Sequence, residues 1–130
     1  MRVESHANTR KPMFNFEKLE VWHKAIGFAD LAYAATKDFP ADERFGLTNQ
    51  IRRAAVSVSA NLAEGSSRTS KIDFARFVEI ATGSLFEVVS QTFVSLRQGF
   101  LREDDHRQLY DAEEELSRML SGLRRSLINE

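Results

Sequence analysis

The chain has 130 residues, of which 42% are hydrophobic and 28% charged, and it contains no cysteine. These values are typical of one globular domain and exclude a disordered or collagen-like chain. The absence of cysteine excludes disulfides, thiol catalysis and cysteine zinc sites. Because the net charge is −1, any binding of nucleic acid must depend on a local basic patch.

The N-terminal region and the hydropathy pattern indicate where the folded part begins. Residues 1–13 show no periodicity, so we expect a flexible N-terminal arm, followed by a helical domain over residues 14–130. The arm lacks the apolar core of a secretory signal, and no apolar run is long enough to span a membrane. We therefore expect a cytoplasmic protein without a membrane partner.

The first predicted helix covers residues 16–38 and ends before Pro40, because a residue that precedes proline is disfavoured in the α region. Asn15 is its expected N-cap. Apolar residues recur at steps of three and four on two neighbouring stripes. We expect the first stripe to face the core: Leu19, Trp22, Ile26, Ala29, Tyr33 and Thr36. The second stripe is Val21, Ala25, Phe28 and Ala32.

The second predicted helix covers residues 47–64 and is followed by Gly65. Its small side chains allow close approach of another helix, and we expect Ala54 to face Thr82 and Gly83. A polar stripe also follows this helix. With Glu87 of the next helix, this stripe predicts an inter-helix polar layer in which Arg53 pairs with Glu87. The members of the layer are Gln50, Arg53, Asn61, Glu64 and Glu87. We interpret this layer as fixing the helix register, with a ligand pocket as the alternative.

The third predicted helix covers residues 71–99, and Ser70 followed by Asp73 resembles a capping box. Its expected inner face is Phe74, Phe77, Ala81, Leu85, Val88, Thr92 and Leu96. Phe86, Phe93 and Phe100 repeat every seven residues beside that face. Such two-sided apolar helices occur at interfaces. We therefore predict an oligomer interface that comprises Val21, Phe28, Phe86, Phe93 and Phe100.

The fourth predicted helix covers residues 104–128, with acidic residues in its first turns and Arg124 and Arg125 near its end, an order that complements the helix dipole. Four amphipathic helices with short connections predict an all-α, antiparallel up-down-up-down four-helix bundle. This topology places basic segments from distant parts of the chain at one end. The nucleic-acid-binding candidates there are Arg10, Lys11, Arg68, Lys71, Arg124 and Arg125.

Two Glu-x-x-His strings, Glu20 to His23 and Glu103 to His106, match the motif of di-iron bundles. In an up-down bundle they lie at opposite ends, so we expect no shared metal, and no cofactor. Nucleophile and phosphate-loop motifs are absent from the sequence. We therefore expect a protein that is not an enzyme.

Several strings together resemble the proteins first found encoded in intervening sequences of bacterial 23S rRNA genes. They are FEKLEVW at 16–22, GLTNQIRRA at 46–54, NLAEG at 61–65 and GSLFE at 83–87. The resemblance covers residues 14–128. It implies a left-handed four-helix bundle that assembles as a ring-like homopentamer, without established catalytic activity. A related accessory protein of diversity-generating retroelements is similarly pentameric and works with nucleic acid and a reverse transcriptase.

These observations predict a self-assembling, non-enzymatic helical-bundle scaffold that binds RNA, DNA or a nucleoprotein through its basic end. The alternative is a protein-only adaptor that recruits a basic partner through its acidic end.

Overall fold

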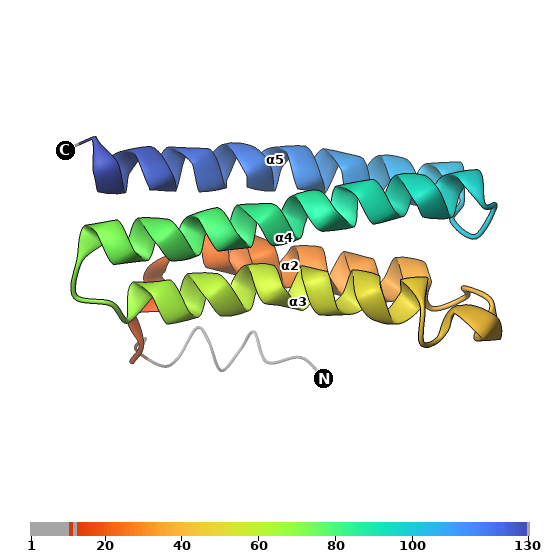
Figure 1. The fold of residues 1–130 in the computed structure, drawn as a ribbon, viewed down its shortest axis with the longest axis horizontal. Helices are drawn as coiled ribbons and strands as arrows, with labels where there is room; N and C mark the ends of the chain where they lie inside the picture. The colour runs from red at the N-terminus through yellow and green to blue at the C-terminus, as the bar shows by residue number, and fades with distance from the viewer. Residues whose placement is uncertain (1–10, 12, 130) are drawn as a thin grey trace.

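The computed structural model describes residue 11 and residues 13–129, and over this part of the chain it contains helices and no strand. Four long helices lie side by side and antiparallel (Figure 1), which confirms the predicted all-α fold. The helices are α2 (Glu20–Thr36), α3 (Leu47–Ser66), α4 (Lys71–Arg97) and α5 (Glu103–Ile128), with 3-10 turns η1 (Asn15–Lys18) and η2 (Ala41–Glu43). Apart from Lys11 and Met13, the predicted arm over 1–13 lies outside the described residues.

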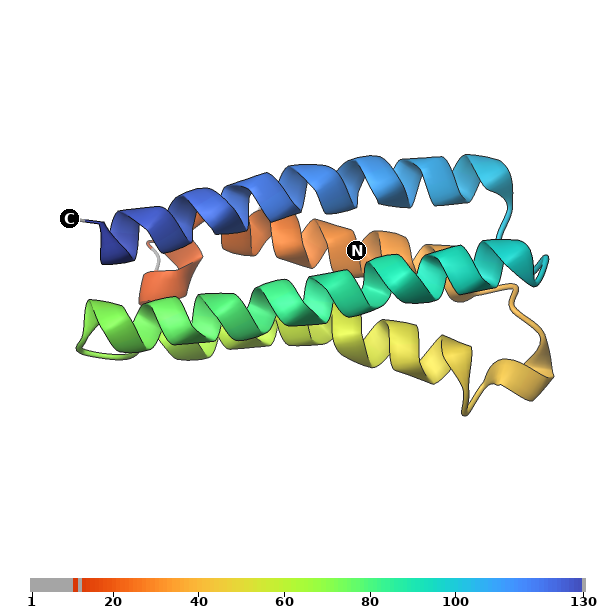
Figure 2. The ribbon, with the colours of Figure 1, turned by 45° about the horizontal axis from the view of Figure 1, so that its top comes forward.

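The helices form a closed square in cross-section. Each helix packs against the next one in the chain, and α2 also packs against α5 (Figure 2). Within the described chain the backbones of α3 and α5 do not approach each other closely, so these helices lie diagonally across the bundle. As a result, the bundle has four outer grooves, one between each pair of adjacent helices.

The first helix differs from its prediction in where it begins and in which stripe it buries. Residues 15–18 form the 3-10 turn η1, and Leu19 is extended with φ −88° and ψ 117°, so α2 begins at Glu20 and Asn15 is not its N-cap. Only part of the first stripe faces the core: Leu19, Trp22 and Ala29 pack against its margin, whereas Ile26 and Tyr33 are 37% and 47% exposed. The buried side chains are those of the second stripe, together with Thr36: Val21, Ala25, Phe28, Ala32 and Thr36.

Val21 and Phe28 were therefore wrongly predicted as interface residues. They are 6% and 2% exposed within a single chain and pack in its apolar core. The two stripes of α2 are offset by one residue, and both are apolar enough to be buried. The second stripe contains Ala25 and Ala32, whose small side chains let α2 lie close to its neighbours.

The middle of α4 faces the core as predicted, with Ala81, Leu85, Val88 and Thr92 buried. The predicted N-cap is also confirmed, because the Ser70 hydroxyl accepts a hydrogen bond of 2.9 Å from the amide of Asp73. Phe100, the last of the five predicted interface residues, is half-buried at the margin of the core, with its ring 6.0 Å from that of Phe39.

The close approach of α3 and α4 occurs at Gly65 and not at Gly83. A Cβ atom built on Gly65 would lie 2.6 Å from Cβ of Phe77 and 3.0 Å from Cδ1 of Phe74. A Cβ atom on Gly83 would meet nothing within 4 Å. The expected contact of Ala54 with Gly83 is therefore wrong, because Gly83 lies on the exposed side of α4.

Candidate functional site

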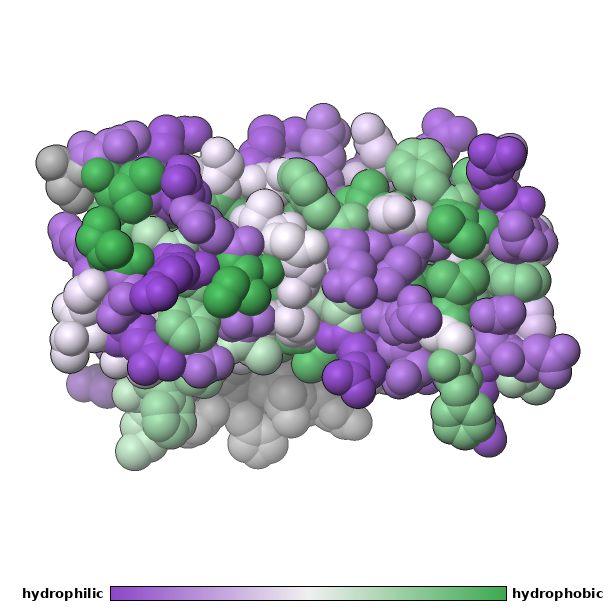
Figure 3. Space-filling view, viewed as in Figure 1, coloured by the Kyte–Doolittle hydropathy of each residue, from purple (hydrophilic) through white to green (hydrophobic). Residues whose placement is uncertain are grey.

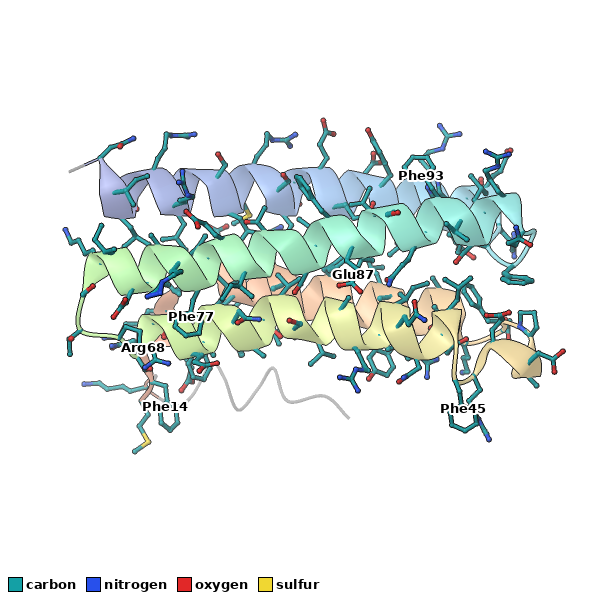
Figure 4. All side chains as sticks on the ribbon, viewed as in Figure 1. Phe14, Phe45, Arg68, Phe77, Glu87 and Phe93 are labelled. Atoms are coloured by element: carbon teal, nitrogen blue, oxygen red, sulfur yellow. The ribbon has the colours of Figure 1, made fainter. Side chains whose placement is uncertain are left out.

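A group of large apolar side chains remains exposed along the groove between α4 and α5. Phe86 and Phe93 on α4 are 59% and 44% exposed, and Tyr110 on α5 is 45% exposed. The ring of Phe93 lies 4.6 Å from that of His106 and 6.2 Å from that of Tyr110, both edge to face. We call Phe86, Phe93, His106 and Tyr110 the aromatic face. Figure 4 places Phe93 beside α5.

Two pockets indent the aromatic face, and each contains a buried polar atom without a partner. The first, of about 410 Å³, is lined by Phe93, His106 and Tyr110 among others, and the buried Nε2 of His106 has no hydrogen-bond partner within the described chain. The second, of about 160 Å³, lies between Phe86 and Tyr110. It contains Glu113, whose Oε1 also has no partner among the described residues. Unpartnered buried polar atoms are rare in folded proteins, so both call for an explanation.

Glu113 is an unusual residue for this position, since it is only 2% exposed in the middle of a helix. Burial raises the pKa of Glu113 from 4.5 to about 7, and the hydrogen bond with Thr92 opposes that rise. The Thr92 hydroxyl lies 3.0 Å from the carbonyl oxygen of Val89 and 3.4 Å from Oε2 of Glu113. A hydroxyl has one proton. If that proton goes to the nearer carbonyl, a protonated Glu113 can donate its own proton to Thr92.

The predicted polar layer lies at the surface between α3 and α4, and its central ion pair does not form. Arg53 and Glu87 are exposed and line one pocket of about 340 Å³, but no ion pair joins these two described residues. The helices are joined here by a hydrogen bond of 2.9 Å between the hydroxyls of Ser57 and Ser84. Figures 3 and 4 show a hydrophilic stretch over α3 and α4 around Glu87.

The other members of the predicted layer do not bridge α3 and α4. Asn61 donates to both the carbonyl oxygen and the hydroxyl of Ser57, each at 2.9 Å. Glu64 pairs with Arg68 at 3.1 Å, and Gln50 is exposed beside Arg53. The layer therefore does not form one network that fixes the register.

Two adjacent arginines on α3 have no acidic partner among the described residues. Nε of Arg52 donates to the Thr36 hydroxyl at 2.9 Å, and its guanidinium lies 4.6 Å from the centre of the Tyr33 ring. The side chain of Arg53 makes no hydrogen bond or ion pair with the described part of the chain. Between residues 47 and 63 the chain carries no acidic residue, so this surface of α3 is positively charged.

The bundle brings the predicted basic segments to one end, as Figure 1 shows for the end of α5, the start of α4 and the start of α2. Lys11, Lys71 and Arg125 are exposed there without an acidic partner among the described residues. Arg68 and Arg124 are less available, because each pairs with an acid. Arg68 also lies over the ring of Phe77 at 4.7 Å (Figure 4), and Arg124 donates to Glu79 at 2.6 Å. Arg10 lies outside the described residues.

Neither Glu-x-x-His string forms a metal site in the structure. Nε2 of His23 lies 2.8 Å from the carbonyl oxygen of Glu17, and His106 packs against Phe93 near the other end of the bundle. The described residues contain no cluster of three His, Cys, Asp or Glu side chains that could hold a metal ion. They also contain no helix apolar enough over a sufficient length to cross a membrane.

Comparison with known proteins identifies the family. A model of the 23S rRNA-intervening sequence protein family matches residues 17–122. The chain belongs to this family. The match covers the first three helices and most of α5, including both walls of the aromatic face, and it confirms the resemblance seen in the sequence.

A solved structure supports the fold of this family member. A Bacteroides thetaiotaomicron protein of unknown function from the S23 ribosomal protein family superimposes with a TM-score of 0.74 and 21% identity. The alignment covers 81% of this chain and 95% of that protein. At this identity the likeness concerns the fold alone. No curated protein matches the chain.

The aromatic face was only partly predictable. The seven-residue spacing of Phe86 and Phe93 indicated it, whereas Tyr110, His106 and Glu113 were missed. Glu113 belongs to an acidic run, Glu113-Glu114-Glu115, which is the usual signal of a solvated surface. One signal was available: Glu113 lies four residues after Leu109 and three before Leu116, in the middle of the apolar face of its helix.

Proposed function

We propose that this chain is a non-enzymatic scaffold that associates with copies of itself through the aromatic face and binds nucleic acid or a nucleoprotein through its basic end. The observation that carries the proposal is that Phe86, Phe93 and Tyr110 are exposed together in one groove. Aromatic residues are enriched at the centres of protein interfaces, where they bury a large area at low entropic cost. The family resemblance supports a ring-like homopentamer as the assembly.

The charge distribution supports the second part of the proposal. The described residues at the basic end are 11, 13–24, 64–76 and 118–129, and they contain nine Lys or Arg and four Asp or Glu, a net charge of +5. The chain as a whole has a net charge of −1, so the rest of it is acidic. In a ring of parallel subunits the basic end would be repeated, and multivalency would compensate for weak binding by one copy.

Self-association is tested by sedimentation velocity between about 1 and 100 μM, the concentration range of specific and moderately weak complexes. We expect the wild type to sediment as an oligomer and Phe93→Asp to sediment as a monomer. Circular dichroism should show that this variant is folded. Ile80→Asp is the matched control, because it places the same charge at another exposed apolar position of α4. A wild-type monomer over this range would contradict the proposal.

Nucleic-acid binding is tested by fluorescence anisotropy with labelled RNA and DNA at low salt. Binding should weaken steeply with added salt, because each neutralised phosphate releases counterions. The double variant Lys71→Glu with Arg125→Glu should abolish it, whereas Lys37→Glu, an exposed lysine at the opposite end, should change it little. No binding by the wild type below about 100 μM, the upper limit of ordinary non-specific affinity, would favour the adaptor alternative.

A further inference from the structure

The pocket around Glu113 has the chemistry of a receptor for a basic side chain. Its walls are the rings of Phe86 and Tyr110 with Val89 between them, and its acidic groups are Glu113 and Glu114. Glu114 is exposed and already pairs with Arg118 at 3.5 Å, so Glu113 is the acid of this pocket without an ion pair among the described residues. A carboxyl group between two aromatic rings offers both an ion pair and a cation–π surface to a guanidinium.

The groups that surround Glu113 within the chain contribute no positive charge to it. The residues of α4 that line this pocket are Phe86 and Val89, and Thr92 contacts Glu113; none of the three is charged. On α5 the titratable neighbours are Tyr110 and Glu114. Lys24, the one Lys or Arg of α2, pairs with Glu115 at 3.3 Å, and α3 lies diagonally across the bundle from α5. A cation that pairs with an ionised Glu113 would therefore come from outside the subunit.

Arg53 is the cation of the chain that best fits this pocket. Most other described cations in the middle of the helices are engaged: Lys24 and Arg118 have acidic partners, and Arg52 is held by Thr36 and Tyr33. Arg107 is not a candidate, because it lies in the same groove as the pocket. Arg53 is exposed on a different side of the bundle, without an ion pair to any described residue.

Arg53 and Glu113 also lie at similar heights along the bundle. The hydrogen bond between Ser57 and Ser84 aligns α3 with α4, so Arg53, one turn earlier, lies level with Val88. The contact between Thr92 and Glu113 places Glu113 level with Thr92, which lies one turn beyond Val88 on α4. Four residues of helix correspond to about 6 Å. In a cyclic assembly whose axis runs along the bundles, groups at such similar heights on neighbouring copies can meet.

We propose that Arg53 of one copy inserts into the α4–α5 pocket of a second copy and pairs there with Glu113. This inference rests on the proposed self-association and specifies its contact. The two residues lie on different surfaces of the subunit, so the interface is heterologous, the type that generates closed rings or open filaments. In the assembly the pairing satisfies the unpartnered Oε1 of Glu113, and Phe86 and Tyr110 enclose the guanidinium.

The experiment measures self-association by sedimentation velocity at pH 6 and pH 8 for the wild type, Arg53→Gln, Glu113→Gln and the double variant. A group with a pKa near 7 is about 10% ionised at pH 6 and about 90% at pH 8. Because Arg53 binds the ionised form, the wild type should associate up to about tenfold more tightly at pH 8. Each single variant should weaken association at pH 8 and remove this pH dependence.

The double variant gives the decisive comparison. If the two residues pair, it should associate no more weakly than either single variant, since one substitution already removes the contact. Glu115→Gln is the matched control, because it removes an exposed charge from the same helix and should leave the pH dependence intact. Circular dichroism confirms that each variant is folded.

Other results separate the two proposals. An oligomer whose association is unchanged in Arg53→Gln and Glu113→Gln, or whose two losses add in the double variant, would overturn this contact and leave self-association standing. A pH dependence that persists in Glu113→Gln would assign it to a histidine such as His106 and would also overturn the inference. A wild-type monomer at both pH values would overturn self-association itself, and this contact with it.

Discussion

Gly65 is the residue at which the structure makes its sharpest prediction about stability. It is buried near the end of α3, and a Cβ atom there would lie 2.6 Å from Cβ of Phe77 and 3.0 Å from Cδ1 of Phe74. The Cβ of Phe77 is fixed to the backbone of α4, so a rotamer change cannot move it away. A methyl group at position 65 must therefore push α3 and α4 apart or distort one of them.

The magnitude follows from two opposing effects. Overpacking of a well-packed site costs about 1–3 kcal/mol of the free energy of unfolding. Alanine in place of glycine gains up to about 1 kcal/mol of helix propensity, and less in the last turn of a helix. We therefore expect Gly65→Ala to destabilise the fold by about 1–2 kcal/mol, the difference between these two effects.

Gly83→Ala is the matched control, because Gly83 is exposed in the middle of α4 and its Cβ would meet nothing within 4 Å. This variant should stabilise the fold by about 1 kcal/mol. For a chain of this size 1 kcal/mol corresponds to a shift of about 3–5 °C in the melting temperature. Thermal and urea unfolding, followed by circular dichroism at one protein concentration, should give shifts of opposite sign for the two variants. Equal stabilisation by both would refute the close contact at Gly65.

Three further predictions concern the core, the aromatic face and Glu113. Phe28→Ala should destabilise the fold by about 3–5 kcal/mol in urea unfolding, because Phe28 is buried in the core. Phe86→Ala should change the unfolding free energy of the monomer by less than about 1 kcal/mol and weaken self-association in sedimentation, since its ring is mostly exposed. The free energy of unfolding should fall by up to about 3 kcal/mol as the pH rises from 4.5 to 7, because Glu113 ionises in the unfolded chain while it stays protonated in the folded subunit. Glu113→Gln should remove this fall, and an unchanged pH profile would contradict the burial of the acid.

The number and type of elements could be predicted because helical periodicity and local signals act over a few residues. Ser70 caps α4 through its own hydroxyl, and Gly99, with φ +79°, follows the end of the same helix. The seven-residue spacing of Phe86 and Phe93 also placed them on one side of α4. The family strings pointed to the same fold, which the match over residues 17–122 confirmed.

The contacts of the candidate site could not be predicted, because they depend on how the helices are rotated and aligned. Two apolar stripes of α2 differ by one residue, about 100° of rotation, and only packing against α3 and α5 buries Val21 and Phe28. The predicted pair of Arg53 with Glu87 failed for the same reason. Helix register leaves these side chains in one pocket without bringing them into contact.

The sequence by itself determined four helices, the cap of α4, the family and the separation of basic from acidic segments, because each depends on residue type and local spacing. Only the tertiary structure decided which glycine admits a neighbouring helix, which phenylalanines remain exposed, and that one glutamate of an acidic run is buried. Those properties depend on distances between residues that are far apart in the chain. The pocket at Glu113, formed where α4 and α5 meet, exists only once those two helices are in register.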